Sequence, residues 1–420
     1  MTREEFLLAT EYFIRLVRRG ADPDRAGEPV PVKPEGVAWE QIYVLANKHS
    51  LSVAVMRALQ AEENPIENRP PKELWEKWEH VCRVQVMADI QQLYAWEEMS
   101  AYFSEKGLKL LPLKGLHIKK LYSETAARQM GDLDVLYEKE RFKEVRAAME
   151  ELGYKFDKGT ENSHHQVFDR APVTEVELHR ELLPKTSFFI DYYVAPWERA
   201  IPTDVPYIYR YSLEDEYIFM LIHSAKHFTG CGSGVRTVLD FYLFLKKYGS
   251  KLNREYIALE IQKADKYKSL KEPKGVSGCG SSSSIWDRSE DEELIINFEK
   301  TILRVAEGWF GSDNIIIDET GLVLASDGVY GSSENIWKRN YEKNARKYFL
   351  YRIFPAYGYL KKLYPILVKA PFLLPFVWLK RLFRGVFFYG KRIRAEYKFI
   401  KAEQKRKKRE EKQAKKEKDM

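Results

Sequence analysis

The sequence predicts an α+β fold in which a small mixed sheet is flanked by N-terminal and C-terminal helical regions. Residues 1–107 and 213–345 carry apolar side chains at helical spacing, whereas residues 108–212 combine short strand-like runs with amphipathic segments. A composition of 45% hydrophobic and 31% charged residues in 420 suits a folded chain with a sizeable core. The last region, residues 346–420, is aromatic and basic and ends in a charged tail.

Helices are predicted on both sides of the sheet. Residues 39–59 have apolar side chains at roughly helical spacing, and residues 72–106 are rich in Leu, Val, Met and Trp without an internal Gly or Pro. After Leu213 the segments LEDEYIFMLIHSAKHF and VRTVLDFYLFLKKYG are both amphipathic. Residues 274–293, dense in Gly and Ser, are predicted to form a flexible surface loop within the second helical region.

The mixed sheet is predicted between residues 108 and 183. A short apolar run, LKLLPL, leads to Lys114-Gly115 at the entrance of a helix, and GDLDVLY then alternates as a strand does. RFKEVRAAMEELGY has the spacing of an amphipathic helix that stops at Gly153. Two further strand-like runs, HHQVFDR and VTEVELHREL, complete the order strand, helix, strand, helix, strand, strand.

The charge is concentrated at one end of the chain. Residues 391–420 hold 14 Lys or Arg against 6 Asp or Glu, a local charge of +8. Because the whole chain has a net charge of +7, residues 1–390 sum to −1. A neutral body argues against a protein that wraps nucleic acid, because such a protein builds a basic surface into its fold. Three scattered cysteines and an N-terminus without a signal-peptide layout predict a cytoplasmic protein.

Acidic residues in the predicted sheet indicate a metal site. Asp132 and Asp134 project from one face of their strand because side chains alternate, and Glu175, Glu177 and His179 share a face of a later strand. Hard divalent cations take carboxylate oxygens as ligands. We therefore predict Asp132, Asp134 and Glu177 as metal ligands, with Glu175 as the alternative third acid. His179 is predicted to support the metal site or contact a phosphate; the alternative is a purely structural histidine.

Basic residues near the acid pair indicate a phosphate site. Lys114 and Gly115 open a predicted helix, where free amides and a positive charge favour phosphate. Arg128 precedes the acids and is predicted to neutralise phosphate charge; the alternative is a surface arginine. His223 and His227 share a helix face but lack the acid of a zinc-protease HExxH helix, which favours a structural or nucleotide-pocket role.

Taken together, these motifs resemble a known family. The run LKG, then RxxGDLDVL, and then the strand VELH are similar to the uncharacterised nucleotidyltransferase family of the DNA polymerase β-like superfamily. The resemblance covers about residues 35–245 and includes a helical segment with His223, Lys226, His227, Arg236 and Asp240. One departure is that many superfamily members have Gly-Gly or Gly-Ser where this chain has Lys114-Gly115, so phosphate contact is expected to depend on the lysine.

The resemblance implies a metal-dependent enzyme that transfers a nucleoside monophosphate from an NTP, such as ATP, to an acceptor hydroxyl. Two Mg²⁺ ions would be held by Asp132, Asp134 and Glu177, with Lys114 and Gly115 on the β- and γ-phosphates. The acceptor is unknown and could belong to a cell-envelope or polysaccharide-related pathway. One alternative is a non-catalytic nucleotide-binding protein on the same fold, but such a protein should lack one of the acids, and all three are present. Another is an RNA-directed nucleotidyltransferase, which the charge of −1 outside the tail disfavours.

The C-terminal segment is predicted to bind a membrane surface without crossing it. The apolar run APFLLPFVWL, residues 370–379, is about half of the length that a spanning helix requires. Basic residues flank it, which is typical of an interfacial segment on an anionic leaflet. We expect residues 361–420 to dock on the inner membrane face, with Phe372, Phe376 and Trp378 inserted. The alternative is that the apolar run packs on the helical domain and the tail is solvated.

Overall fold

The structure is a computed structural model, and it describes residues 2–161, 163–172, 174–184, 187, 189–230, 232–269, 293–328, 353–355, 357–364, 366–383, 393–402 and 404–405. The N-terminal helices are α1 (Arg3–Ala21), α2 (Trp39–Lys48), α3 (Ser52–Leu59) and α4 (Lys72–Glu105). The predicted helix over 72–106 is confirmed as α4. The helical spacing of residues 39–59 is confirmed as α2 and α3, which Ser50 separates with a φ of 56°.

The sheet has five strands, in the order β1-β2-β5-β4-β3. They are β1 (Leu110–Pro112), β2 (Leu133–Tyr137), β3 (Lys155–Phe156), β4 (His165–Arg170) and β5 (Thr174–His179). β2 and β5 run parallel, and the other pairs are antiparallel, so the predicted mixed sheet is confirmed. Between the strands lie α5 (Gly115–Ile118) and α6 (Phe142–Glu151). α6 ends before Gly153, whose φ of 84° reverses the chain as predicted.

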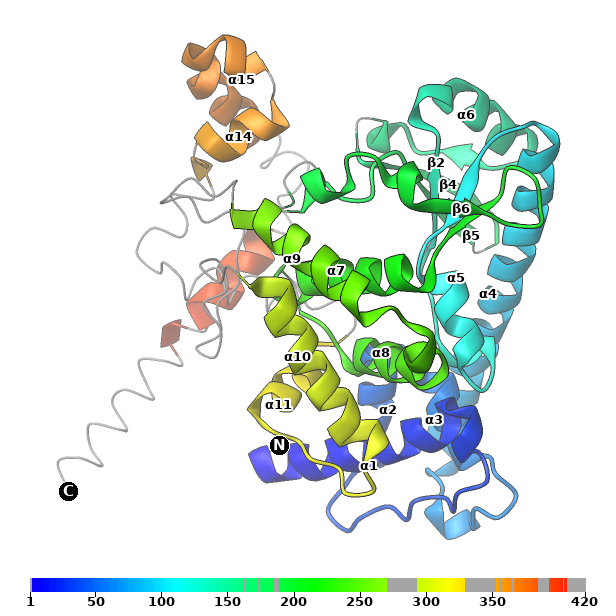
Figure 1. Cartoon of the computed structure of the whole chain (residues 1–420). Helices are drawn as coiled ribbons and strands as arrows, with labels where there is room; N and C mark the ends of the chain where they lie inside the picture. Colours follow the sequence, from blue (N-terminus) through cyan, green and yellow to red (C-terminus); the bar gives the residue numbers. More distant parts are fainter. Residues whose placement is uncertain are drawn as a thin grey trace.

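The two faces of the sheet have different surroundings. Leu133 and Val135 of β2 and Val176 of β5 pack with Met99 and Phe103 of α4 in one apolar cluster. Figure 1 shows α4 running along this side of the sheet. Because side chains alternate along a strand, the acidic residues of β2 and β5 project from the opposite face.

The helices after the sheet pack on the N-terminal helices. A two-stranded ribbon, β6 (Ala200–Pro202) and β7 (Tyr209–Tyr211), leads into α7 (Leu213–Gly230), α8 (Val235–Tyr248), α9 (Arg254–Ser269), α10 (Leu294–Ala306) and α11 (Glu319–Asp327). Phe13 of α1, Phe241 of α8 and Ile302 of α10 belong to one buried apolar cluster. The helices that precede the sheet in sequence and those that follow it therefore share one core. The boundaries predicted at residues 107, 212 and 345 stay predictions.

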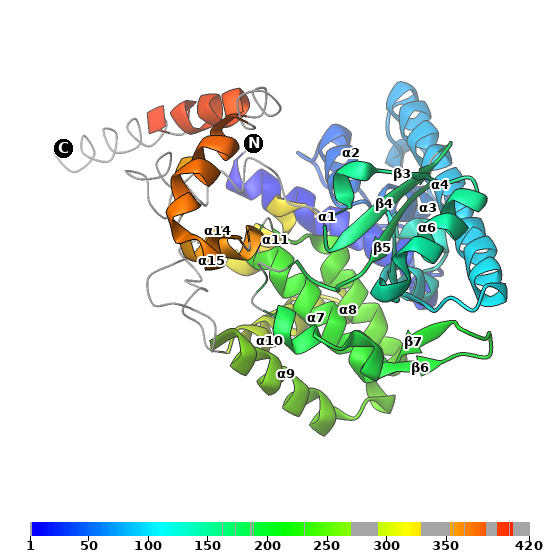
Figure 2. The same cartoon turned by 90° about the horizontal axis from the view of Figure 1, so that it is seen from above.

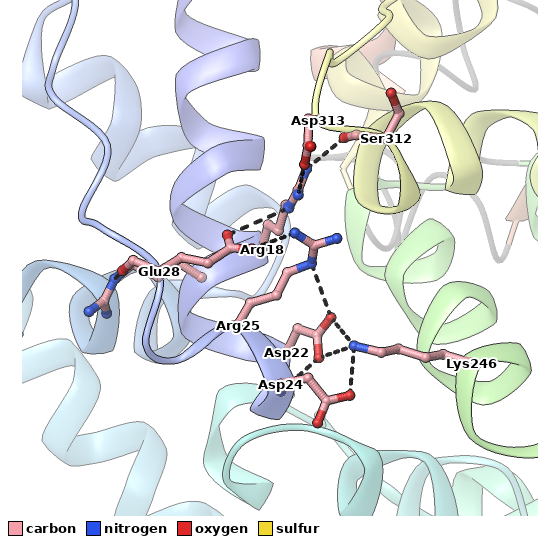
Figure 3. Close-up of polar contacts among 9 residues, drawn as sticks. Arg18, Asp22, Asp24, Arg25, Glu28, Lys246, Ser312 and Asp313 are labelled. Carbon is pink, nitrogen blue, oxygen red and sulfur yellow. Dashed lines mark hydrogen bonds and ion pairs between the residues drawn. The ribbon is translucent and has the colours of Figure 1, made fainter.

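Polar contacts reinforce this packing (Figure 3). Lys246 Nζ on α8 lies 2.7 Å from Asp22 Oδ2 and 2.9 Å from Asp24 Oδ2, just after α1. Arg18 of α1 pairs with Asp313 at 2.8 Å and donates to the Ser312 carbonyl at 2.6 Å, beyond α10. These contacts fix α1 against two helices that follow it by more than two hundred residues.

The described C-terminal helices form a separate small cluster. α14 (Tyr357–Leu363), α15 (Ile366–Lys369) and the helix at 374–383 bury Leu360, Leu367 and Val377 against one another. Both views place α14 and α15 on the side of the molecule opposite α4 (Figures 1 and 2). No helix among the described residues is long and apolar enough to cross a membrane. The predicted Gly/Ser loop at 274–293 lies, apart from Glu293, outside the described residues.

Candidate active site

The predicted acids lie together on one face of the sheet. Asp132 immediately precedes β2, and Asp134 lies within it, opposite Glu177 in the parallel register with β5. One oxygen each of Asp132, Glu175 and Glu177 lie within 4.8 Å of one another, and so do ligand atoms of Asp134, Glu177 and His179. Glu177 belongs to both groups, whereas Glu175 is exposed and belongs to one. This arrangement favours Glu177 as the third acid.

The two aspartates have opposite electrostatic surroundings. Burial and the neighbouring charge of Asp134 raise the pKa of Asp132 to about 6. Burial alone would also raise the pKa of Asp134, but the Lys114 ammonium and a hydrogen bond from His179 outweigh it and lower that pKa. Asp134 is therefore stabilised as a carboxylate, and Asp132 lacks an equivalent compensating charge.

His179 connects the two strands. Its Nε2 donates to Asp134 Oδ1 at 2.8 Å and lies 3.6 Å from Glu177 Oε2. Burial alone would lower the pKa of His179, but its hydrogen bonds to these two carboxylates raise it to about 8. The structure therefore places His179 beside the acids, as the sequence predicts.

Lys114 also reaches the acids. Its Nζ lies 3.1 Å from Asp134 Oδ2 and 2.9 Å from His223 Nε2, so it connects the sheet to α7. The residue has a φ of 25°, a left-handed value that few non-glycine residues adopt. Gly115 follows it at the start of α5, where a Cβ would lie 2.8 Å from Met130 Sδ. A larger residue at this position would therefore displace the Met130 side chain, a packing contact that the sequence did not suggest.

A set of histidines surrounds the acids; the sequence favours a structural or nucleotide-pocket role for His223 and His227 and predicts none for His164 and His165. His164 and His165 come from β4 and the residue before it, while His223 and His227 face the site from α7. Burial is the main cause that lowers the pKa of His164 and His227 to about 3 and that of His223 well below its usual value. The charge of Lys226 contributes to each of these shifts, so its ammonium group lies near the same site. The adjacent residues His164 and His165 were the only signal in the sequence, and the pairing of β4 with β5 is what places them beside the acids.

Arg128 anchors the loop that leads to Asp132 and β2. Its Nε and Nη2 each donate to Asp240 of α8 at 2.7 Å, and Tyr122 donates to the same carboxylate at 2.6 Å. Nearby, Arg236 donates to the Gln129 carbonyl and Gln92 to the Met130 carbonyl. The side chain of Arg128 is only 7% exposed. Its prominent contact is therefore structural, and phosphate binding by Arg128 stays a prediction.

One family of known proteins matches more than half of this chain. The model of a family described as uncharacterised nucleotidyltransferase matches residues 35–271, more than half of the chain and all the candidate residues. No curated protein matches the chain. Among solved structures, the solution structure of the antibiotic-resistance factor ANT(2'')-Ia is similar over 43% of this chain and 96% of its own, with 16% identity and a TM-score of 0.33. That likeness is too low to support a further argument.

Proposed function

This chain belongs to the uncharacterised nucleotidyltransferase family, and from that premise we propose that it transfers a nucleoside monophosphate from an NTP to an acceptor hydroxyl, with two Mg²⁺ ions. The observation that carries the proposal is the register of β2 and β5. It places Asp134 opposite Glu177, and Glu177 has an oxygen within 4.8 Å of an oxygen of Asp134 and one within 4.8 Å of an oxygen of Asp132, so it lies between the two aspartates.

The residues present fit magnesium. All three are oxygen donors, as Mg²⁺ prefers, and the pKa of Asp132, raised to about 6, indicates negative charge that the protein leaves partly uncompensated. When bound to Asp132, Asp134 and Glu177, the ions would neutralise charge on the attacking and leaving oxygens. His179 would keep Asp134 oriented through the 2.8 Å hydrogen bond.

The remaining roles follow from position. Lys114 Nζ, now 3.1 Å from Asp134, is proposed to bind the β- and γ-phosphates together with the Gly115 amide. As the acceptor oxygen bonds to the α-phosphorus, the bond to the β-phosphate oxygen breaks and pyrophosphate leaves. Glu177 is proposed to take the proton of the acceptor hydroxyl. In this scheme Lys114 faces the leaving group, and Glu177 faces the acceptor hydroxyl.

Label transfer tests this function. Full-length protein is incubated with Mg²⁺ and each NTP, labelled either at the α- or at the γ-phosphate, in the presence of fractionated cell extract that supplies acceptors. We expect α-label in a product and γ-label only in pyrophosphate. Transfer of the γ-label to an acceptor would mean phosphoryl transfer, and α-label incorporated equally well by Asp134→Asn would contradict the proposed site. Incorporation into RNA alone would favour the RNA-directed alternative.

We further propose that residues 361–420 hold the enzyme on an anionic membrane surface. In the small cluster formed by α14, α15 and the helix at 374–383, four apolar side chains at helical spacing are 54–75% exposed: Phe372, Phe376, Leu379 and Phe383. Trp378 is different, because its Nε1 donates to the Pro355 carbonyl at 3.0 Å and its ring packs on Phe354. Insertion is therefore proposed for the phenylalanines, and Trp378 stabilises the cluster. An enzyme docked in this way could reach an acceptor lipid or glycolipid precursor that lies in the membrane.

A further inference from the structure

Three histidines lie side by side next to the carboxylates. His165 of β4 is paired in register with His179 of β5, and His164 immediately precedes β4. One ring nitrogen of each lies within 4.8 Å of one nitrogen of both others. We propose that His164, His165 and His179 bind a transition-metal ion, with Zn²⁺ as the reference ion, at a site distinct from the proposed magnesium site.

The spacing of the rings suits a single ion. Their centres are 4.4 Å apart for His164 and His165, 5.3 Å for His165 and His179, and 5.8 Å for His164 and His179. Tetrahedral zinc with Zn–N bonds of about 2.0–2.1 Å holds the centres of two imidazoles about 5 Å apart. The observed separations lie on both sides of that value, so small side-chain rotations would bring the nitrogens into place.

Unsatisfied nitrogens indicate that the cluster lacks a ligand. Nδ1 of His179 and Nδ1 of His165 are buried and make no hydrogen bond, and the His179 side chain is only 8% exposed. His165 Nδ1 lies 3.2 Å from Glu177 Oε2 without forming a hydrogen bond to it. Buried polar atoms are nearly always paired in folded proteins, and a bound ion would pair these.

The surroundings of His179 resemble those of a metal ligand. Its Nε2–H donates to Asp134 Oδ1, so Nδ1 is the nitrogen left for a metal ion, which would bind there in place of a proton. Histidines that bind metals usually donate their other nitrogen to a carboxylate in this way. Imidazole ligands favour zinc, cobalt, nickel or copper, whereas magnesium favours oxygen. The carboxylates and the three histidines should therefore select different ions. Asp134 links the two sites, because it is a proposed magnesium ligand and accepts the hydrogen bond from His179.

Cobalt is a suitable probe because its visible absorption reports coordination geometry. Full-length protein is freed of metal with a chelator, and Co²⁺ is added in the presence of excess Mg²⁺. We expect one Co²⁺ per chain with the intense visible bands of a tetrahedral site, displaced by Zn²⁺ and retained against Mg²⁺. Absence of Co²⁺ binding, or release of Co²⁺ by Mg²⁺, would overturn the proposal.

Variants locate the bound ion. His164→Gln and His165→Gln should each weaken Co²⁺ binding by more than the roughly 10- to 100-fold that loss of an outer carboxylate partner costs. His80→Gln, at an exposed position of α4, serves as the matched control and should not change it. His227→Gln tests the rival pair, in which the Nε2 atoms of His223 and His227 lie 2.8 Å apart. Strong binding in both His164→Gln and His165→Gln, or loss in His227→Gln, would contradict the assignment. Melting curves identify any variant that does not fold.

Discussion

Asp132 and Asp134 are two residues apart on one strand face, yet the protein treats them differently. Asp134 accepts a hydrogen bond from His179 and pairs with Lys114, whereas the pKa of Asp132 is raised to about 6 by burial and by Asp134 itself. The ionised form of Asp132 therefore opposes folding, and that of Asp134 supports it. Substitution of the two should separate catalytic loss from loss of stability.

We expect Asp132→Asn and Asp134→Asn each to lower the rate of nucleotidyl transfer at least about 100-fold, equivalent to about 2.7 kcal/mol of barrier. Without metal, Asp132→Asn should keep or raise the free energy of unfolding. Asp134→Asn should lower it by about 1.5–3 kcal/mol, because two charged partners lose their acceptor. Label transfer and urea unfolding measure the two effects. Full transfer by both variants would end the two-metal hypothesis, and equal stabilities would refute the electrostatic difference.

Lys114→Ala should weaken NTP binding about 10-fold, since a charged hydrogen bond to phosphate contributes about 1.4 kcal/mol or more. Binding of Mg²⁺ alone should be unchanged or tighter, because the variant removes a positive charge 3.1 Å from Asp134. Titration calorimetry measures both affinities. Lys120→Ala is the control, since Lys120 is exposed on the next helical turn. An unchanged NTP affinity in Lys114→Ala would restrict Lys114 to a structural role.

At the scale of elements, local patterns predicted the strands that carry the site. Alternation was enough to place Asp132 and Asp134 on one face of their strand, and Glu177 on one face of the later strand, because a strand fixes side-chain direction within a few residues. The pairing of β2 with β5 then brings the two faces together. The histidines of β4 could not be placed in this way. Their position depends on pairing with β5, and the sequence does not specify which strands are neighbours. The same limit applies to Arg128, whose partner Asp240 lies 112 residues away.

His49 offers a test of how the helices are joined. It follows α2, accepts a hydrogen bond from the Val235 amide at the start of α8 at Nδ1, and donates from Nε2 to the Ala325 carbonyl of α11. Burial lowers the pKa of His49 to about 3 from an ordinary value of 6.5. Between these values the unfolded chain binds the proton and the folded chain does not. The free energy of unfolding should therefore fall as pH decreases from 6.5 toward 3.

His49 should contribute about 1.4 kcal/mol per pH unit to this slope. We expect His49→Asn to reduce the slope by about that amount between pH 6 and 4, even if its stability at neutral pH is lower. Urea unfolding at several pH values measures it, with His80→Asn as the exposed control. An identical pH dependence in His49→Asn and the parent would show that His49 is protonated in the folded protein.

At the scale of the whole molecule, charge and exposed apolar side chains coincide at one end of the chain. Residues 391–420 carry +8, while Phe372 and Phe376 are 75% and 67% exposed on the preceding helices. These helices have their own small core and lie apart from α4. Of the three residues that the sequence predicts to insert, Phe372 and Phe376 are exposed, whereas Trp378 packs on Phe354 within the cluster. Docking on a membrane stays a prediction.

The protein should float with vesicles containing anionic lipid and not with neutral ones. Deletion of residues 391–420 should remove most of the salt-sensitive binding, because the Debye length shortens from about 10 Å at 0.1 M salt to about 3 Å at 1 M. Phe372→Ala with Phe376→Ala should remove the salt-insensitive remainder. Ile90→Ala on α4, another exposed apolar position, is the control. Failure of the full-length protein to float at low salt would contradict membrane docking.

The central claim is that Asp132, Asp134 and Glu177 hold the metal ions that receive an NTP. It is tested most directly by a crystal structure of the full-length protein with Mn²⁺ and an NTP whose α–β bridge cannot be cleaved, using the anomalous signal to locate the ions. We predict manganese on all three carboxylates, with the triphosphate between them and Lys114. Nucleotide bound elsewhere, or manganese at sites that exclude these acids, would contradict the account.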